Sequence, residues 1–165
     1  EVLSTVHARS GVFYPLQPFS HERAIDWAET PLFVEAVRHN DLELLASLAH
    51  SLTSKVYQYS SQQRQTLHMA AVFACNFSNY CYDLSKQIVD EQQVDFSLLY
   101  PLILETAQKA TINNPKEMQT GPAMRGDENI LKMHQQLLEK NSGSDLVDVY
   151  KLLSESIMKR HLHGK

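Results

Sequence analysis

Short β-like runs alternate with short helical runs over the first sixty residues of the chain. Runs typical of β-strands occur at residues 11–16, 31–36 and 55–59. Between the last two runs, leucines recur at helical spacing from Leu42 to Leu52, after a candidate N-cap at Asn40 or Asp41. The order strand, helix, strand predicts a parallel α/β layer. Because three short strands make a poor sheet on their own, we expect further strands upstream.

From residue 60 onward the hydrophobic period changes to about 3.6 residues, which predicts helices at 61–90, 95–111, 127–139 and 144–161. The first of these helices is apolar almost all round, so we expect it to lie in the middle of a bundle. At about 1.5 Å per residue it would extend roughly 40 to 45 Å, longer than one small domain needs. We therefore expect it to contact a partner. Pro101 should kink or restart the second helix.

The composition is that of a globular protein in water, since 43% of the residues are hydrophobic and 21% are charged. The longest apolar stretches, such as residues 69–75, are far shorter than the roughly 20 residues that cross a membrane. A net charge of −4 without a basic face gives no electrostatic basis for binding nucleic acid. Cys75 and Cys81 are too far apart on one helix to form a disulfide, which favours a reducing, cytoplasmic location. Because the chain begins with Glu1, we expect it to be part of a longer protein.

A line of polar residues runs along the first predicted helix. At roughly 100° per residue, Arg64, His68, Cys75 and Asn79 fall within about a 60° sector, with Asn76 near one edge. Burying such groups costs several kcal/mol unless partners or solvent satisfy them, so this line is expected to face a crevice or a polar helix contact. His68 is the best proton donor or acceptor among them, because imidazole titrates near neutral pH. The alternative is a core histidine and asparagines bonded to backbone carbonyls.

The segment of residues 119–127 predicts a structured loop before a helix. Gly121 and Gly126 allow positive φ or close approach of a ligand, and Pro122 also directs the backbone. Thr120 supplies a hydroxyl, and Arg125 supplies a guanidinium suited to a carboxylate or phosphate. Alternatively, Arg125 pairs with Asp127 or another acid and holds the loop shut.

Residues 14–20 follow the first predicted strand at the sheet edge where open α/β folds bind ligands. Gln17 and Ser20 could reach a ligand there, although a connection bracketed by prolines is the simpler explanation of the segment. We predict no metal site, because His161 and His163 lie in a basic chain end without carboxylate or cysteine partners. The sequence contains neither a glycine-rich phosphate loop nor a defensible nucleophile triad.

Four segments of the chain resemble successive motifs of one family. These segments are GVFYPLQPFS at 11–20, LHMAAVFACNF at 67–77, PLILETA at 101–107 and QTGPAMRGD at 119–127. The family comprises Rossmann-like NAD(P)-dependent oxidoreductases whose C-terminal half is a domain of unknown function, and the resemblance covers about residues 8–161.

The resemblance implies a mainly α fold with two domains. Residues 1–59 would be the last strands of a truncated Rossmann-like α/β domain that lacks the first βαβ unit and its glycine fingerprint. Residues 60–165 would be a helical bundle of the 6-phosphogluconate dehydrogenase C-terminal-like type, similar also to pyrroline-5-carboxylate reductase. The bundle would bind substrate and form a homodimer through the long helix 61–90.

The resemblance also implies roles for particular residues. His68 would be catalytic, Arg64, Asn76, Thr120 and Arg125 would bind substrate, and Pro15 and Gln17 would lie beside the nicotinamide. The intact protein would use NADP or NAD to transfer hydride to or from a small carbonyl or imine compound that bears a carboxylate. This chain alone would be inactive and would bind no cofactor tightly. The alternative is a non-catalytic helical module for dimerisation or ligand sensing.

Overall fold

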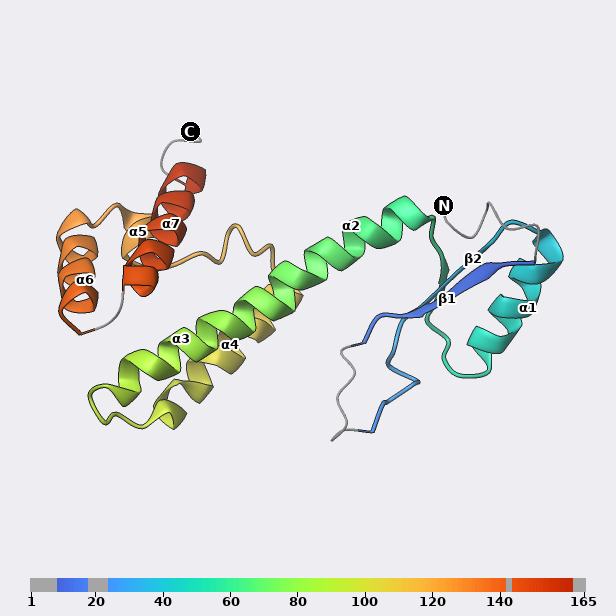
Figure 1. Cartoon of the computed structure of the whole chain (residues 1–165), viewed down its shortest axis with the longest axis horizontal. Coiled ribbons are helices and arrows are strands. Elements are labelled where there is room, and N and C mark those ends of the chain that lie inside the picture. Colours follow the sequence, from blue (N-terminus) through green and yellow to red (C-terminus); the bar gives the residue numbers. More distant parts are fainter. Residues whose placement is uncertain (1–8, 18–23, 142–143, 162–165) are drawn as a thin grey trace. The chain divides into compact units, whose positions relative to one another are not determined.

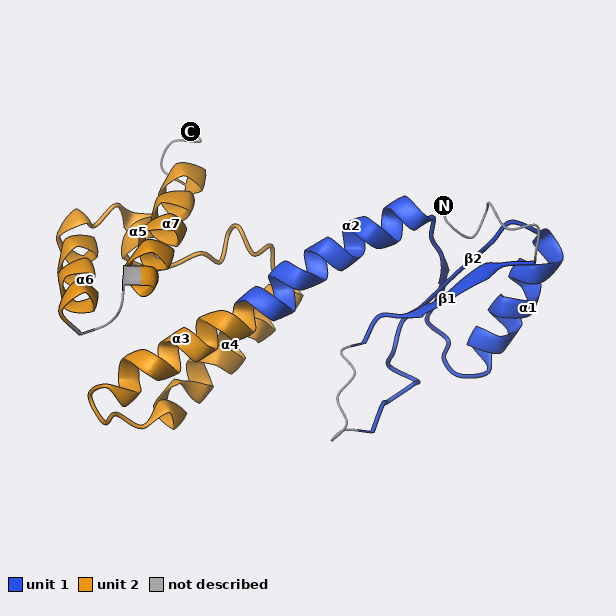
Figure 2. Ribbon diagram, in the orientation of Figure 1, with its two compact units in different colours: residues 1–77 blue, residues 78–165 orange. Residues whose placement is uncertain are grey.

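The computed structural model describes residues 9–17, 24–141 and 144–161 (Figure 1). The chain divides into two compact units, Glu1–Phe77 and Ser78–Lys165 (Figure 2). This division falls within the long helical segment, so unit 1 contains both the sheet and the first half of that segment. The predicted division into domains after residue 59 stays a prediction.

Unit 1 is built on a three-stranded sheet of order β1-β2-β3. The strands are β1 (Gly11–Pro15), β2 (Leu32–Ala36) and β3 (Val56–Gln58). Helix α1 (His39–His50) connects β2 to β3, and these two strands pair in parallel, as the pattern predicts. Strand β1 is antiparallel to β2, so the expectation of a parallel layer is wrong for this strand. The Leu16 amide donates to the Pro31 carbonyl at 3.0 Å, which continues the antiparallel pairing one position beyond Pro15 and Leu32.

The core of unit 1 lies between β2 and α1. Leu32 and Val34 alternate along β2 and are fully buried together with Ala49 of α1. Phe33 points to the opposite face of the sheet, as the period of two in a strand requires. There its ring centroid lies 6.2 Å from Tyr14, 5.5 Å from Tyr57 and 5.0 Å from Tyr59. Both faces of β2 are therefore covered, one by α1 and one by aromatic rings.

The predicted helix 61–90 is present but is not uniform. It consists of α2 (Ser61–Ala71), a π-helical segment η2 (Val72–Phe77) and α3 (Ser78–Asp90). None of these three elements contains a buried residue, and Phe73 of η2 is 65% exposed. Within the described residues this segment is largely exposed, and its expected position in the middle of a bundle stays a prediction. Cys75 and Cys81 are free thiols, as predicted.

Unit 2 contains the remaining helices, which follow the predicted segments closely except for a short helix at Pro122–Arg125, within the segment predicted to be a loop. The 3-10 turn η3 (Phe96–Leu99), with Asp95 as its N-cap, precedes α4 (Tyr100–Ile112), and Pro101 restarts the helix in its first turn. Helices α6 (Glu128–Asn141) and α7 (Ser144–His161) pack on each other and on the short helix α5 (Pro122–Arg125) (Figure 1). The specific bundle type stays a prediction.

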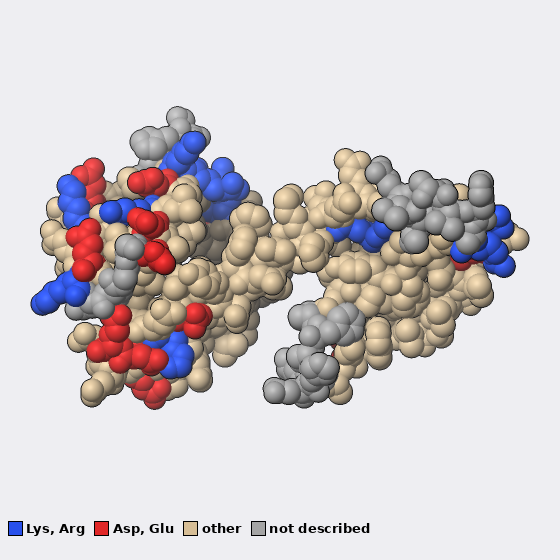
Figure 3. Space-filling view, in the orientation of Figure 1, with Lys and Arg blue, Asp and Glu red and all other residues tan. Residues whose placement is uncertain are grey.

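The surface carries charges of both signs. On the face shown in Figure 3, basic and acidic side chains are interspersed over the C-terminal helices. Several of these charges pair within one helix, as Lys132 does with Glu128 at 3.3 Å. Among the helices that the structure describes, none combines the length and apolar character that a membrane span requires.

Candidate functional site

An open hollow of about 850 Å³ lies in unit 1 between strand β1 and helix α2. Val12 and Tyr14 of β1 line one side. Ser61, Gln62, Arg64, Gln65 and His68 of α2 line the other. This volume is in the range of small-molecule sites. Two residues predicted to carry function, Arg64 and His68, therefore line one hollow, which makes it the candidate site of this unit.

The first turn of α2 is held by a capping box. The Ser60 amide donates to Gln63 Oε1 at 2.9 Å, and the Gln63 amide donates to Ser60 Oγ at 3.3 Å. Strand β3 ends at Gln58, so the helix begins almost directly after the sheet. Residues three or four positions apart on a helix share one side, and this spacing brings Ser61, Arg64 and His68 to the hollow in successive turns.

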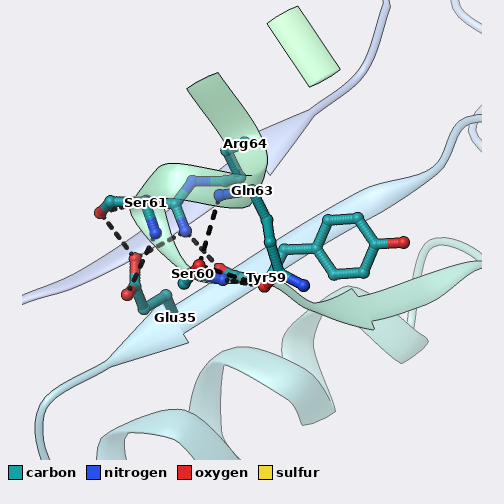
Figure 4. A network of polar contacts seen from close by, with 6 residues as sticks. All are labelled: Glu35, Tyr59, Ser60, Ser61, Gln63 and Arg64. Carbon is teal, nitrogen blue, oxygen red and sulfur yellow. Dashed lines mark hydrogen bonds and ion pairs between the residues drawn. The ribbon is translucent and has the colours of Figure 1, made fainter. Parts of the chain in front are cut away.

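A network of polar contacts fixes the Arg64 guanidinium (Figure 4). Arg64 Nη1 donates to the Tyr59 carbonyl at 2.5 Å and lies 2.6 Å from Glu35 Oε2, while Nη2 donates to Ser61 Oγ at 3.0 Å. The Arg64 side chain is only 12% exposed. Its guanidinium thus joins the start of α2 to the sheet. The predicted contact of Arg64 with substrate stays a prediction.

Glu35, near the end of β2, is the acidic member of this network. In addition to its ion pair with Arg64, it accepts hydrogen bonds from Ser61 Oγ at 3.0 Å and from the Ser61 amide at 3.3 Å. Burial alone would raise the pKa of Glu35, but the hydrogen bonds from Arg64 and Ser61, together with the charge of Arg64, outweigh it and hold the pKa below its usual value. The carboxyl group is therefore ionised at neutral pH.

His68 follows Arg64 by one helical turn and is exposed where it lines the hollow. Within the described part of the chain its imidazole makes no hydrogen bond to another side chain or to the backbone. His68 is therefore not the core histidine that the alternative explanation requires. Asn76, in the π-helical segment η2, and Asn79 are exposed as well.

The residues predicted beside the nicotinamide lie close to the hollow in sequence. Pro15 is half-buried and ends β1, one residue after Tyr14, and Gln17 is exposed. Neither is among the residues that line the hollow. Ser20, His163 and residues 18–20 of the first motif lie outside the described residues.

The predicted loop of residues 119–127 belongs to unit 2. Gly121 and Gly126 both have positive φ, 104° and 69°, as expected for glycines that shape a loop. Asp127 Oδ1 accepts from the Ile130 amide at 3.3 Å and caps α6. Arg125 is exposed, and among the ion pairs of the described residues none joins it to Asp127. Thr120 is exposed too, and the roles of Thr120 and Arg125 in substrate binding stay predictions.

Sequence reasoning missed Glu35 and the two glutamines Gln62 and Gln65, whereas Tyr14 belongs to the candidate segment of residues 14–20. One feature of the sequence could have indicated that Glu35 has a specific partner: it is the only acidic residue within the otherwise apolar strand LFVEA. Its partner Arg64 is far away in sequence, so no local pattern identifies the pair. Among the described residues, no three or more His, Cys, Asp or Glu residues are grouped as ligands for a metal ion.

Comparison with known proteins shows the family to which the chain belongs. Residues 30–157 match the model of a family described as a domain of unknown function, DUF2520, and the chain belongs to this family. No protein with curated function matches the chain.

Two solved structures are similar to this chain. One, from Bacteroides fragilis, is described as a “putative NADP oxidoreductase”; it is 40% identical with a TM-score of 0.88, and the match covers 96% of this chain and 61% of that one. The other, from Thermotoga maritima, is 20% identical with a TM-score of 0.72 and shows a shared fold over 93% of this chain and 62% of that one. The present chain therefore spans less than two thirds of either protein.

Proposed function

We propose that this chain is part of an NADP- or NAD-dependent oxidoreductase that acts on a small carbonyl or imine compound bearing a carboxylate. The observation that carries the proposal is the hollow of unit 1, where the exposed imidazole of His68 lies across from Tyr14 of β1. The similarity to the Bacteroides protein supports the same class of reaction. The helices of residues 60–165 would belong to the type found in 6-phosphogluconate dehydrogenase and pyrroline-5-carboxylate reductase.

The residues of the hollow fit the nicotinamide end of such a cofactor. Tyr14, Gln62 and Gln65 offer an aromatic ring and uncharged hydrogen-bonding groups, which suit a flat ring carrying a carboxamide. When bound, the cofactor supplies or accepts the hydride. Pro15 and Gln17, at the end of β1, would lie beside it.

In this proposal His68 moves the proton that accompanies hydride transfer. Its imidazole would donate a proton to the reacting oxygen or nitrogen, or accept one in the reverse direction. Asn76 would assist in positioning the substrate, with Thr120 and Arg125 binding its carboxylate. Arg64 would flank the substrate while its guanidinium remains bound to Glu35.

The decisive experiment measures turnover by the full-length protein with an identified substrate. We expect His68→Gln to lower kcat by about 10²- to 10⁴-fold, the usual contribution of a general acid or base. His50→Gln, at the exposed end of α1, is the matched control and should leave kcat unchanged. Unchanged turnover in His68→Gln would remove His68 from the mechanism.

A homodimer through the helical segment 61–90 is the second part of the proposal. An exposed apolar stripe runs along this segment, formed by three residues spaced four positions apart: Met69, Phe73 and Phe77. The ring centroids of Phe73 and Phe77 lie 4.9 Å apart. Exposed apolar patches of this kind mark interaction sites. The same stripe favours the alternative function, a non-catalytic dimerisation or ligand-sensing module. Titration with NADPH separates the two, because the module predicts no binding even by the full-length protein.

The cellular location is also part of the proposal. Two free thiols, one of them exposed, are suited to a reducing compartment such as the cytoplasm.

A further inference from the structure

The positive charge of Arg64 is matched within the protein. Among the described residues that line the hollow, Arg64 is the one side chain with a permanent positive charge. Its Nη1 lies 2.6 Å from Glu35 Oε2, and the side chain is 12% exposed, so little of the charge faces solvent. Because the two charges lie 2.6 Å apart, the repulsion of a ligand anion by Glu35 opposes its attraction by Arg64.

The N-terminus of helix α2 is the second source of positive potential beside the hollow. Helix N-termini attract anions through their unpaired amides. Here the Ser61 amide already donates to Glu35 Oε1, and the Gln63 amide donates to Ser60 Oγ. Glu35 therefore occupies the position that an anionic ligand would take at this helix.

Apart from the His68 imidazole, the groups that remain available in the hollow are uncharged. The Tyr14 hydroxyl and the Gln62 and Gln65 amides can each donate and accept hydrogen bonds. Such groups recognise a carboxamide or a hydroxyl and offer no charge to balance a carboxylate or phosphate.

We infer that Glu35 determines the charge specificity of the hollow: by neutralising Arg64 and the N-terminus of α2, it selects an uncharged polar group and excludes an anionic one. The carboxylate of the proposed substrate is then bound outside this hollow. The inference rests on the proposed function only in treating the hollow as a ligand site.

The test uses nicotinamide and nicotinate, two probes that share a ring and differ in charge. Binding to the whole chain is followed by the backbone amide chemical shifts of residues 61–68. The unmodified protein should bind nicotinamide at least about tenfold more tightly than nicotinate. This ratio is measured without any substitution and does not depend on the folding of a variant.

The variant Glu35→Gln keeps the size of the side chain and removes its charge. It should bind nicotinate roughly tenfold more tightly than the unmodified protein does, because the positive charge of Arg64 then has no carboxylate to balance it. The double variant Glu35→Gln, Arg64→Gln should lose this gain. Equal binding of the two probes by the unmodified protein, or no gain of nicotinate binding in Glu35→Gln, would overturn the inference. Because no turnover is measured, failure here is distinct from failure of the proposed reaction.

Discussion

Replacing Arg64 by methionine tests whether its guanidinium holds helix α2 to the sheet. The substitution keeps a long side chain whose stem can still pack, so the main change is the loss of the charged group and its donors. The guanidinium contacts Glu35, the Tyr59 carbonyl and Ser61 Oγ, which belong to β2, to the segment after β3 and to α2. All three contacts disappear together in the variant.

The expected cost is about 2 kcal/mol. Hydrogen bonds to charged groups contribute about 1.5–3 kcal/mol, whereas exposed ion pairs contribute about 0–1 kcal/mol. The Glu35 side chain is 37% exposed and keeps its two hydrogen bonds from Ser61, so it is not left unpaired. The loss therefore stays below the roughly 3–5 kcal/mol observed when a fully buried pair is broken.

Trp27 provides the assay for this variant. It is the only tryptophan of the chain and packs against the core of unit 1, so its fluorescence reports unfolding of that unit. Urea titration of Arg64→Met should show a free energy of unfolding lower by about 2 kcal/mol, equivalent to a Tm lower by roughly 10 °C in a unit of this size.

Lys55→Met is the matched control, because Lys55 forms an ion pair with Glu29 in the same unit but both side chains are at least 37% exposed. Its free energy of unfolding should change by less than about 0.5 kcal/mol. An equally small change in Arg64→Met would refute the reasoning that this network anchors the helix.

Three further outcomes are expected. Leu32→Ala removes most of a fully buried side chain and should lower the free energy of unfolding by about 3 kcal/mol in the same fluorescence assay. Leu44→Ala, at an exposed position, should lower it by less than about 0.5 kcal/mol, and similar losses in the two variants would contradict the assigned core. Because the pKa of Glu35 is lowered by folding, its contribution to stability is complete above the ordinary value of 4.5 and is lost as the pH falls through the lowered pKa. Glu35→Gln should therefore lose less stability than the unmodified protein between about pH 5 and pH 3, and parallel losses would exclude this role. Sedimentation of the chain at micromolar concentration should show a dimer that becomes a monomer when Phe73 and Phe77 are both replaced by serine and persists in Leu44→Ser; a monomeric unmodified chain would end the dimer proposal.

Local patterns in the sequence were sufficient to place most elements. The short β-like run at residues 31–36 predicts β2, the 3.6-residue period predicts α6 and α7, and Pro101 marks the restart of the helix at α4. These features depend on neighbours within a few positions, where periodicity and capping act. The positive φ of Gly121 and Gly126 follows from the same local chemistry.

The placement of Arg64 and His68 along one hollow also follows from helical spacing, because residues four positions apart share a side. Whether that side of the helix faces solvent or another element does not follow from spacing. The sequence alone could not separate a crevice from a buried polar contact, because the difference depends on which other elements cover the helix. The structure places β1 opposite α2 across an open hollow, which leaves His68 exposed.

Contacts between distant parts of the chain were decided only by the tertiary structure. The direction of β1, the exposure of the helical segment and the pairing of Glu35 with Arg64 all depend on which surfaces meet when the sheet and helices pack. The hydrogen-bonded ends of β2 and β3 bring Glu35 to the start of α2, although no periodic pattern links their positions. Sequence therefore determined where each helix and strand forms, while the fold decided which charges meet, because the energy of an ion pair depends on distance in space and not on separation along the chain.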